Sequence, residues 1–302
     1  MRQLPKLQQL KAFQQVIRCG SIRAAARALD QSQPAISRSI QELEQTLKTQ
    51  LIVRGSKGMT LTPNGHIFAL RVQLVIEELQ RATEEIQQLD QRSQGSLAIG
   101  CSSLLAVTLL PKLVELFKAS TPQANLLIRE AQLSTLLPAL QAGKLDFAVG
   151  TSSPELPLQD LVLEPLFSAP FCVIARRGHP LAQATTLHEL HEAKWLLPET
   201  DMGYYQQLQT LLGNFYQQLS QRPIRSDSAV CGLNMVLKAD YLTIVARAMN
   251  TPFYLHQELV ALPIDDLPQA QYCVLYSQKS PLTVTARRFL DLLRSHCQHY
   301  PW

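Results

Sequence analysis

The sequence predicts an α/β protein with an all-α-type N-terminal domain, in which a winged helix-turn-helix and one long helix precede an α/β domain. Three observations predict this architecture. Residues 21–43 have the pattern of two short helices around a tight corner, residues 63–91 have the periodicity of one helix, and strand and helix patterns alternate from residue 97 onward. At 302 residues, with 46% hydrophobic and 17% charged residues, the composition is that of a folded chain of about two domains.

The helix-turn-helix pattern lies in the segment SIRAAARALDQSQPAISRSIQEL. Ser21 and Ser32 are suitable N-caps, and Pro34 is tolerated in the first turn of the second helix. Apolar residues of that helix recur at steps of three and four, which leaves Gln, Ser and Arg side chains on the opposite face to bond bases and phosphates. The residues expected to contact DNA are Arg23, Gln31, Ser32, Gln33, Pro34, Ser37 and Arg38, with Arg54 and Lys57 in the hairpin that follows.

The charge distribution favours this interpretation over an ordinary helical hairpin with a polar outer face. Residues 1–62 contain ten Lys and Arg against three Asp and Glu, a net charge of +7, whereas the remainder contains 18 basic and 21 acidic residues, a net charge of −3. A local positive excess of this kind attracts the phosphate backbone of double-stranded DNA.

The elements around the helix-turn-helix follow from turn residues and periodicity. A helix is expected over 6–18 with Gly20 as its stop, and the segment 51–62 is a hairpin around Gly55-Ser56-Lys57-Gly58, which would form the wing. In the long helix, apolar residues recur at alternating steps of four and three, which favours pairing with a second chain over docking on its own domain. These seam residues are Phe68, Val72, Val75, Leu79, Ala82, Ile86 and Leu89.

The α/β part begins after the linker 92–96. Strands over 97–101, 125–131 and 144–151 alternate with helices over 104–119 and 134–142, an order that predicts a parallel sheet with right-handed crossovers. Further strands are expected at 171–177, 195–198, 241–246, 259–264 and 271–277, and helices at 187–192, 204–219, 233–238 and 284–297.

Three blocks of the chain resemble the LysR-type transcriptional regulators. They are SIRAAARALDQSQPAISRSIQELEQTL, LIVRGSKGMTLTPNG and GHPLAQATTLHELHEAKWLLP, and EAQLSTLLPALQAGKLDFAVGT is similar to the branch with activators of anaerobic threonine/serine catabolism and aminobenzoyl-glutamate utilisation. The resemblance implies a DNA-binding domain (1–62), a dimerisation helix (63–92) and an effector-binding domain (93–302) built like a periplasmic binding protein. It also implies two subdomains, about 96–163 with 266–302 and about 164–265, and a homodimer or homotetramer.

An effector is expected beyond the carboxyl ends of the parallel strands, where ligands bind in open α/β sheets. Hydroxyls and free backbone N–H groups in those loops suit a small carboxylate effector, although helix capping explains any single hydroxyl equally well. By position and by the resemblance, the expected effector-binding residues are Ser102, Ser103, Leu133, Ser134, Thr151, Met202, Tyr204 and Ser228.

Other functions have weaker support. No apolar run is long enough for a membrane span and no secretory signal pattern opens the chain, so a cytoplasmic location is expected, with no membrane partner. Neither a metal at His188-x-x-His191 nor a redox-active Cys101 is favoured over a structural role, and no enzyme motif or cofactor site is recognisable. The alternatives are a sequence-indifferent DNA-binding architectural protein and a solute-binding protein, which would need an export signal.

Overall fold

The computed structural model describes residues 4–55, 58–89, 95–152, 156, 158, 160–199, 213, 215, 217–250, 257–265 and 267–302. The chain divides into two compact units. The first, called the head here, comprises Met1–Gln87 with Gln141–Lys144, and the second, called the sensor, comprises Gln88–Leu140 with Leu145–Trp302. Each unit is described by itself.

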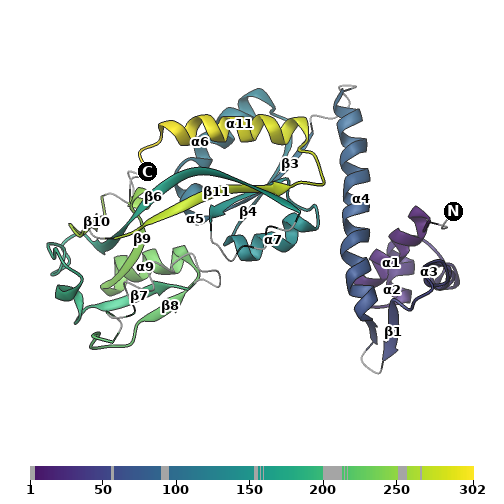
Figure 1. The fold of residues 1–302 in the computed structure, drawn as a ribbon, viewed down its shortest axis with the longest axis horizontal. Helices are drawn as coiled ribbons and strands as arrows, with labels where there is room; N and C mark the ends of the chain where they lie inside the picture. Colours follow the sequence, from purple (N-terminus) through teal and green to yellow (C-terminus); the bar gives the residue numbers. More distant parts are fainter. Residues whose placement is uncertain are drawn as a thin grey trace. The chain divides into compact units, whose positions relative to one another are not determined.

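The head contains the predicted elements in the predicted order (Figure 1): α1 (Leu7–Cys19), α2 (Ile22–Ala28), α3 (Gln33–Leu47), the hairpin strands β1 (Ile52–Gly55) and β2 (Gly58–Leu61), and α4 (Pro63–Leu89). Both expected caps are present, because Ser21 Oγ accepts the Ala24 N–H at 3.2 Å and Ser32 Oγ accepts the Ala35 N–H at 3.3 Å. Asp30, with φ 52°, makes the corner between α2 and α3. The winged helix-turn-helix prediction is confirmed.

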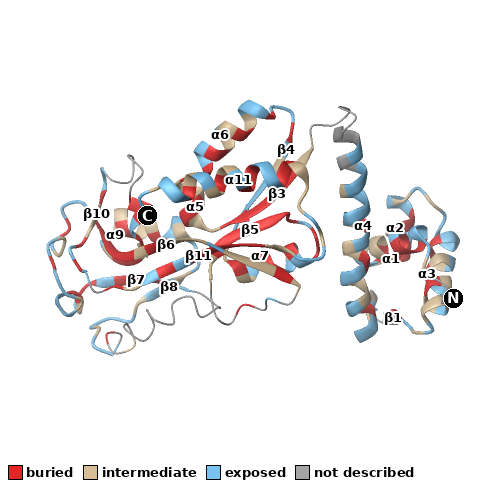
Figure 2. Cartoon of the chain, turned by 45° about the horizontal axis from the view of Figure 1, so that its top comes forward, coloured by how far each residue is buried: buried red, intermediate tan, exposed pale blue. Residues whose placement is uncertain are grey.

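A small apolar core holds the head together (Figure 2). Phe13, Ala25, Ile36 and Leu43 are fully buried between the first three helices. The hairpin is tied to the end of α3 by Glu44, whose Oε1 accepts the N–H groups of Leu51 at 2.7 Å and Ile52 at 3.1 Å. These two bonds help to fix the chain where it passes from α3 into β1.

The apolar seam predicted for α4 divides into two parts. Phe68 and Val72 pack into the head core together with Ile76, which the seam prediction did not include. In contrast, Val75, Leu79 and Ile86 are 46%, 48% and 62% exposed. The first turns of α4 therefore pack on their own domain, and the expected continuous seam is interrupted there. Heptad spacing identifies apolar residues but does not show whether they pack on the α1–α3 core or stay exposed.

The sensor is built on one mixed sheet. Its strands are β3 (Ser96–Cys101), β4 (Asn125–Glu130), β5 (Phe147–Thr151), β6 (Leu161–Arg176), β7 (Lys194–Pro198), β8 (Ile224–Ser226), β9 (Tyr241–Ala246), β10 (Leu259–Ala261) and β11 (Gln269–Ser277). Among the described residues the order is β4-β3-β5-β11-β6-β9-β7-β8, with β10 paired to β6. The parallel arrangement predicted for β3, β4 and β5 is confirmed, while β11 and β6 run antiparallel to their neighbours.

Strand β6 joins two halves of this sheet. Its first part pairs with β11 from Leu161 to Pro170 and its last part pairs with β9 from Phe171 to Ile174. The sequence predicted a strand only from residue 171, because the two prolines before it argue against a central strand. The structure accommodates Pro165 at a register shift and places Pro170 where β6 leaves β11 for β9.

The sensor helices are α5 (Ser103–Val107), α6 (Leu110–Ser120), α7 (Leu133–Gln141), α9 (Ala229–Ala239) and α11 (Val284–His299), with short 3-10 turns η1 (His188–Leu190) and η2 (Arg247–Asn250). The single helix predicted over 104–119 is wrong. Pro111 lies at the start of α6 and cannot donate an amide hydrogen to the preceding turn, so the helix is interrupted at Thr108. The helix predicted over 204–219 falls mainly outside the described residues.

Separate apolar clusters fill the two halves of the sensor. Phe117, Phe147 and Phe289 pack in the half around β3 and β5, and Trp195 packs with Leu242 and Ile244 in the half around β7 and β9. Phe167 on β6 contacts both clusters and stacks on Trp302 with ring centroids 3.5 Å apart. Across the described residues, no helix has both the length and the apolarity that a membrane span requires.

Candidate functional site

The outer face of α3 presents the polar side chains that the sequence predicted. Ser32, Gln33, Pro34 and Arg38 are exposed, and Gln31 and Ser37 are partly exposed. The buried residues Ile36, Ile40 and Leu43 fix the opposite face of the helix in the core. Arg23 is exposed on α2. The arrangement is that of a recognition helix with a positively charged flank, which can enter the major groove of DNA.

Arg38 has a partner within α3. Its Nε lies 2.9 Å from Oε1 of Glu42, and the Arg38 side chain is 82% exposed. The hydrogen bond from Arg38, with a further one from Gln9, lowers the pKa of the Glu42 carboxyl. A phosphate or base that binds Arg38 would compete with Glu42 for its guanidinium group.

The wing is held by bonds to the start of α4. Thr62 Oγ1 donates to the Gln50 carbonyl at 2.8 Å and accepts the Gly65 N–H at 2.9 Å. A Cβ at Gly65 would lie 2.1 Å from the Leu51 carbonyl oxygen, so only glycine allows this approach. Arg54 lies in β1 opposite Met59, and Lys57 lies outside the described residues.

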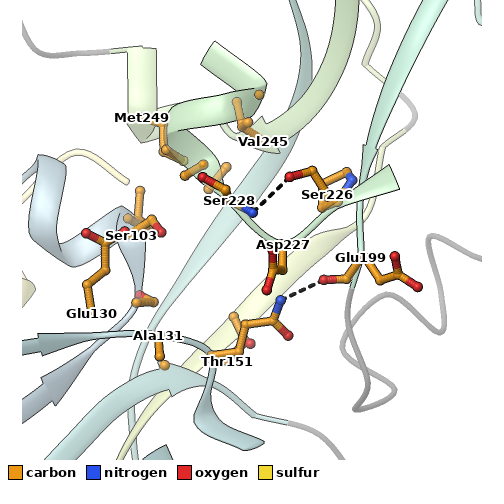
Figure 3. Close-up of a pocket in the computed structure, with 18 of the residues that line it drawn as sticks. Ser103, Glu130, Ala131, Thr151, Glu199, Ser226, Asp227, Ser228, Val245 and Met249 are labelled. Atoms are coloured by element: carbon orange, nitrogen blue, oxygen red, sulfur yellow. Dashed lines mark hydrogen bonds between the residues drawn. The ribbon is translucent and has the colours of Figure 1, made fainter. Parts of the chain in front are cut away.

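The sensor contains a cavity of about 560 Å³ at the carboxyl ends of β3, β4 and β5. Its other wall comes from β7, β8, β9 and the start of α9 (Figure 3). Six predicted effector-binding residues line it: Ser102, Ser103, Leu133, Ser134, Thr151 and Ser228. The fold therefore brings together residues that lie more than 120 positions apart in the chain. Met202 and Tyr204 lie outside the described residues.

The pocket hydroxyls fall into two groups. Ser228 Oγ caps α9 by accepting the Cys231 N–H at 3.2 Å, and Ser103 Oγ donates to Glu130 Oε1 at 2.6 Å. In contrast, the buried Oγ atoms of Ser102 and Ser134 have no hydrogen-bond partner among the described residues. Buried hydroxyls without partners are uncommon, which makes these two oxygens candidates for contact with a bound molecule.

The sequence predicted free backbone N–H groups where β3 ends, without naming which residues supply them. The N–H of Ser102 is not one of them, because it donates to the Val149 carbonyl at 2.9 Å. Sheet geometry is the reason, because the residue after β3 continues the pairing with β5. The helix that follows, α5, is also only five residues long. The hydroxyl of Ser102, rather than its amide, is therefore the group available to a ligand.

Comparison with known proteins identifies the family. Residues 7–66 match the profile described as bacterial regulatory helix-turn-helix protein, lysR family, and residues 90–298 match the LysR substrate binding domain. The chain belongs to the LysR family. It is a transcriptional regulator with a DNA-binding head and an effector-binding sensor, as the sequence resemblance predicted.

Relatives cover almost the whole of this LysR-family chain. It is 36% identical to the HTH-type transcriptional regulator TdcA of Escherichia coli strain K12 over 297 residues, which are 98% of this chain and 95% of that protein. Full-length OxyR from Pseudomonas aeruginosa shares the fold, with a TM-score of 0.68 and 20% identity over 98% of this chain and 95% of that one. CbnR in complex with its target DNA has a TM-score of 0.68 and 20% identity, and the match covers 96% of this chain and 99% of that one.

Several residues that line the pocket of this LysR-family sensor were missed by sequence reasoning. Glu130 ends β4, so the rule that selected Ser102 could have found it. Met249 and Tyr272 come from η2 and β11, far from any motif, and no local signal marks them. The same holds for Thr243 on β9. These residues reach the pocket only because the second half of the sheet forms one of its walls.

Cys101 and His191 were considered for redox chemistry and for metal binding, and the structure gives both a structural environment. Cys101 is fully buried at the end of β3, and burial, with a smaller effect of Glu130, raises the pKa of its thiol to about 12. The thiolate that oxidation chemistry requires is therefore scarce at neutral pH. His191 Nδ1 contacts the His188 carbonyl at 2.9 Å. Within the described ranges, no cluster of three or more His, Cys, Asp and Glu side chains could hold a metal ion.

Proposed function

We propose that this LysR-family regulator reads DNA as a dimer or a dimer of dimers. Each α3 would enter a major groove, with Gln31, Ser32, Gln33, Pro34, Ser37 and Arg38 facing the bases and phosphates and with Arg23, Arg54 and Lys57 facing the backbone. The observation that supports this proposal most directly is that α3 has a buried apolar face and an exposed polar face. Two heads on one DNA face would recognise half-sites about one or two helical turns apart.

The exposed part of α4 supports the dimer. Val75, Leu79 and Ile86 form an apolar stripe whose side chains are about half exposed or more. Pairing two such helices would bury this stripe and would also raise the effective concentration of the second head on DNA. The proposal includes the domain assignment 1–62, 63–92 and 93–302.

The sensor pocket would take a small effector with a carboxylate group. The hydroxyls of Ser102 and Ser134, which have no partner among the described residues, support this placement, with Ser103, Leu133, Thr151 and Ser228 around them. Met202 and Tyr204 complete the proposed set. The similarity to TdcA supports a place among regulators of threonine and serine breakdown and a cytoplasmic location.

Effector binding would be coupled to DNA binding by a population shift. The effector would favour a closed sensor, change the arrangement of paired sensors, and so alter half-site spacing and DNA bend. A ligand can shift this equilibrium only by its difference in affinity for the two states, so effector and DNA must affect each other's affinity equally.

DNA-binding assays test this proposal. Fragments of the source genome bound by the full-length protein are selected. The affinity for the best fragment is then measured by fluorescence anisotropy between about 50 and 200 mM salt, because binding that depends on phosphate contacts weakens strongly over this range. We expect cooperative, salt-sensitive binding to a dyad, with at least a thousandfold preference over scrambled DNA, on the order expected of specific regulators. Equal affinity for dyad and scrambled DNA would instead indicate a sequence-indifferent architectural protein.

A further inference from the structure

The charged residues among the described lining of the sensor pocket are all acidic. Glu130, Glu199 and Asp227 line it, and no Lys, Arg or His is among its described lining residues. Glu130 belongs to one wall, whereas Glu199 and Asp227 belong to the other (Figure 3).

This charge pattern disfavours an effector that carries only negative charge. A carboxylate in the pocket would lose water beside acidic residues, with no cationic side chain among the described lining residues. A positively charged group has the opposite preference, because a concave site lined by one sign of charge concentrates ligands of the other sign. Among the described residues, the carboxylates of Glu199 and Asp227 have no hydrogen-bond or ion-pair partner that an incoming cation would need to displace.

A second observation concerns hydroxyl groups that could donate to a ligand. The buried Oγ atoms of Ser102 and Ser134 have no partner among the described residues, and both lie on the β3 and α7 side of the pocket. A bound carboxylate or carbonyl oxygen would accept their hydrogens. The cavity, at about 560 Å³, is within the usual range for small ligands, which is about 300–1,000 Å³.

We propose that the effector is a zwitterion of the α-amino-acid class, a deepening of the proposed effector site on which it rests. Its carboxylate lies at the Ser102 and Ser134 hydroxyls, and its ammonium group lies toward Asp227. The amine, rather than the carboxylate alone, distinguishes the effector from other small metabolic acids.

Matched ligand pairs test this inference. The thermal midpoint of the full-length protein is measured with L-alanine and L-lactate, L-serine and glycerate, L-threonine and 2,3-dihydroxybutyrate, and L-leucine and 2-hydroxyisocaproate. Each pair shares its carboxylate and carbon chain and differs only in an amine or a hydroxyl at the α position. We expect at least one amino acid to raise the midpoint and its hydroxy acid to bind at least about tenfold more weakly, since a tenfold change is about 1.4 kcal/mol.

Variants then locate the amine. In Asp227→Asn the affinity for the responding amino acid should fall about three- to tenfold, as expected for loss of one partly solvated charge contact, and in Asp227→Lys the preference should move toward the hydroxy acid. Asp265→Asn, at an exposed carboxylate that does not line the pocket, is the matched control and should leave both affinities unchanged.

The outcomes separate this inference from the proposed function. Equal or tighter binding of the hydroxy acids overturns the zwitterion inference and leaves the effector pocket in place. Unchanged amino-acid affinity in Asp227→Asn and Asp227→Lys also overturns it. Absence of a midpoint change with every member of the panel overturns the inference and the proposed effector together.

Discussion

The head and the sensor place their functional groups in opposite ways. In the head, the polar face of α3 is exposed, and its Arg38 pairs with Glu42 on the same helix. In the sensor, two hydroxyls are buried in a concave site without a partner among the described residues. A surface that reads a long polymer can be convex and fully hydrated, whereas a site for a small molecule must surround it. The following changes test how independent the two designs are.

The largest expected effect comes from a large-to-small substitution in the head core. Phe13 is fully buried and packs on Phe68 with ring centroids 5.6 Å apart, so Phe13→Ala should cost about 3–5 kcal/mol, as large-to-small core changes do. We expect DNA binding to be lost while the unfolding transition of the sensor in urea stays unchanged. Phe289→Ala in the sensor core is the matched control and should have the reverse effect; a joint loss in both variants would show that the two units fold as one.

The attachment of the wing is the next test. Glu44→Ala removes the acceptor of two backbone N–H groups, at Leu51 and Ile52, and should lower the free energy of unfolding of the head by about 1–3 kcal/mol. Glu44→Gln keeps one acceptor oxygen and should recover part of the loss. Equal stability of the alanine variant and the unmodified protein in urea unfolding would refute the role given to this carboxylate.

Arg38 tests the outer face of α3. Arg38→Ala should weaken binding to the selected dyad about tenfold and, if its contact is to a phosphate, reduce the slope of log affinity against log salt by about one per head. Because the side chain is exposed, the thermal midpoint should hardly move. Glu42→Gln removes its competitor and should preserve or strengthen DNA binding. A weaker complex with Glu42→Gln would show that the pair acts as a unit on DNA.

Two serines of the pocket should differ from each other. Ser228→Ala removes the cap of α9 and should destabilise the ligand-free sensor by about 1 kcal/mol. Ser102→Ala removes a hydroxyl without a partner and should leave the ligand-free sensor as stable or slightly more stable, while it abolishes stabilisation by the effector. Unchanged ligand-induced stabilisation of Ser102→Ala in scanning fluorimetry would remove this residue from the site.

The smallest expected effect concerns pH. The hydrogen bond from Arg176 lowers the pKa of Asp240, so the folded state binds this proton less readily than the unfolded state. The carboxylate therefore adds stability above its ordinary pKa of about 4 and loses that contribution as the pH falls further. We expect Asp240→Asn to lower the thermal midpoint slightly at pH 7 and not at pH 3. A difference that persists at pH 3 would point to a cause other than ionisation.

Much of the head could be predicted because its signals are local. The caps at Ser21 and Ser32, the apolar stripe with Ile36 and Ile40, and the glycines that flank the hairpin turn all act within a few residues of the structure they specify. The seam of α4 was predicted less well. Periodicity shows that Val72 and Val75 are apolar, but not that the first meets the head core and the second remains exposed.

The sequence by itself determined which side of each helix is apolar, where the α3 helix begins, and that Ser102, Ser134 and Thr151 end up at one edge of a parallel sheet. Only the tertiary structure decided that Glu130, Asp227 and Tyr272 join them, that the Ser102 amide is used by Val149, and that Arg38 faces Glu42. The physical reason is the distance along the chain over which each interaction acts. Backbone bonds and periodicity act over one or two turns of chain, whereas the order and register of strands depend on which distant segments bury each other's side chains.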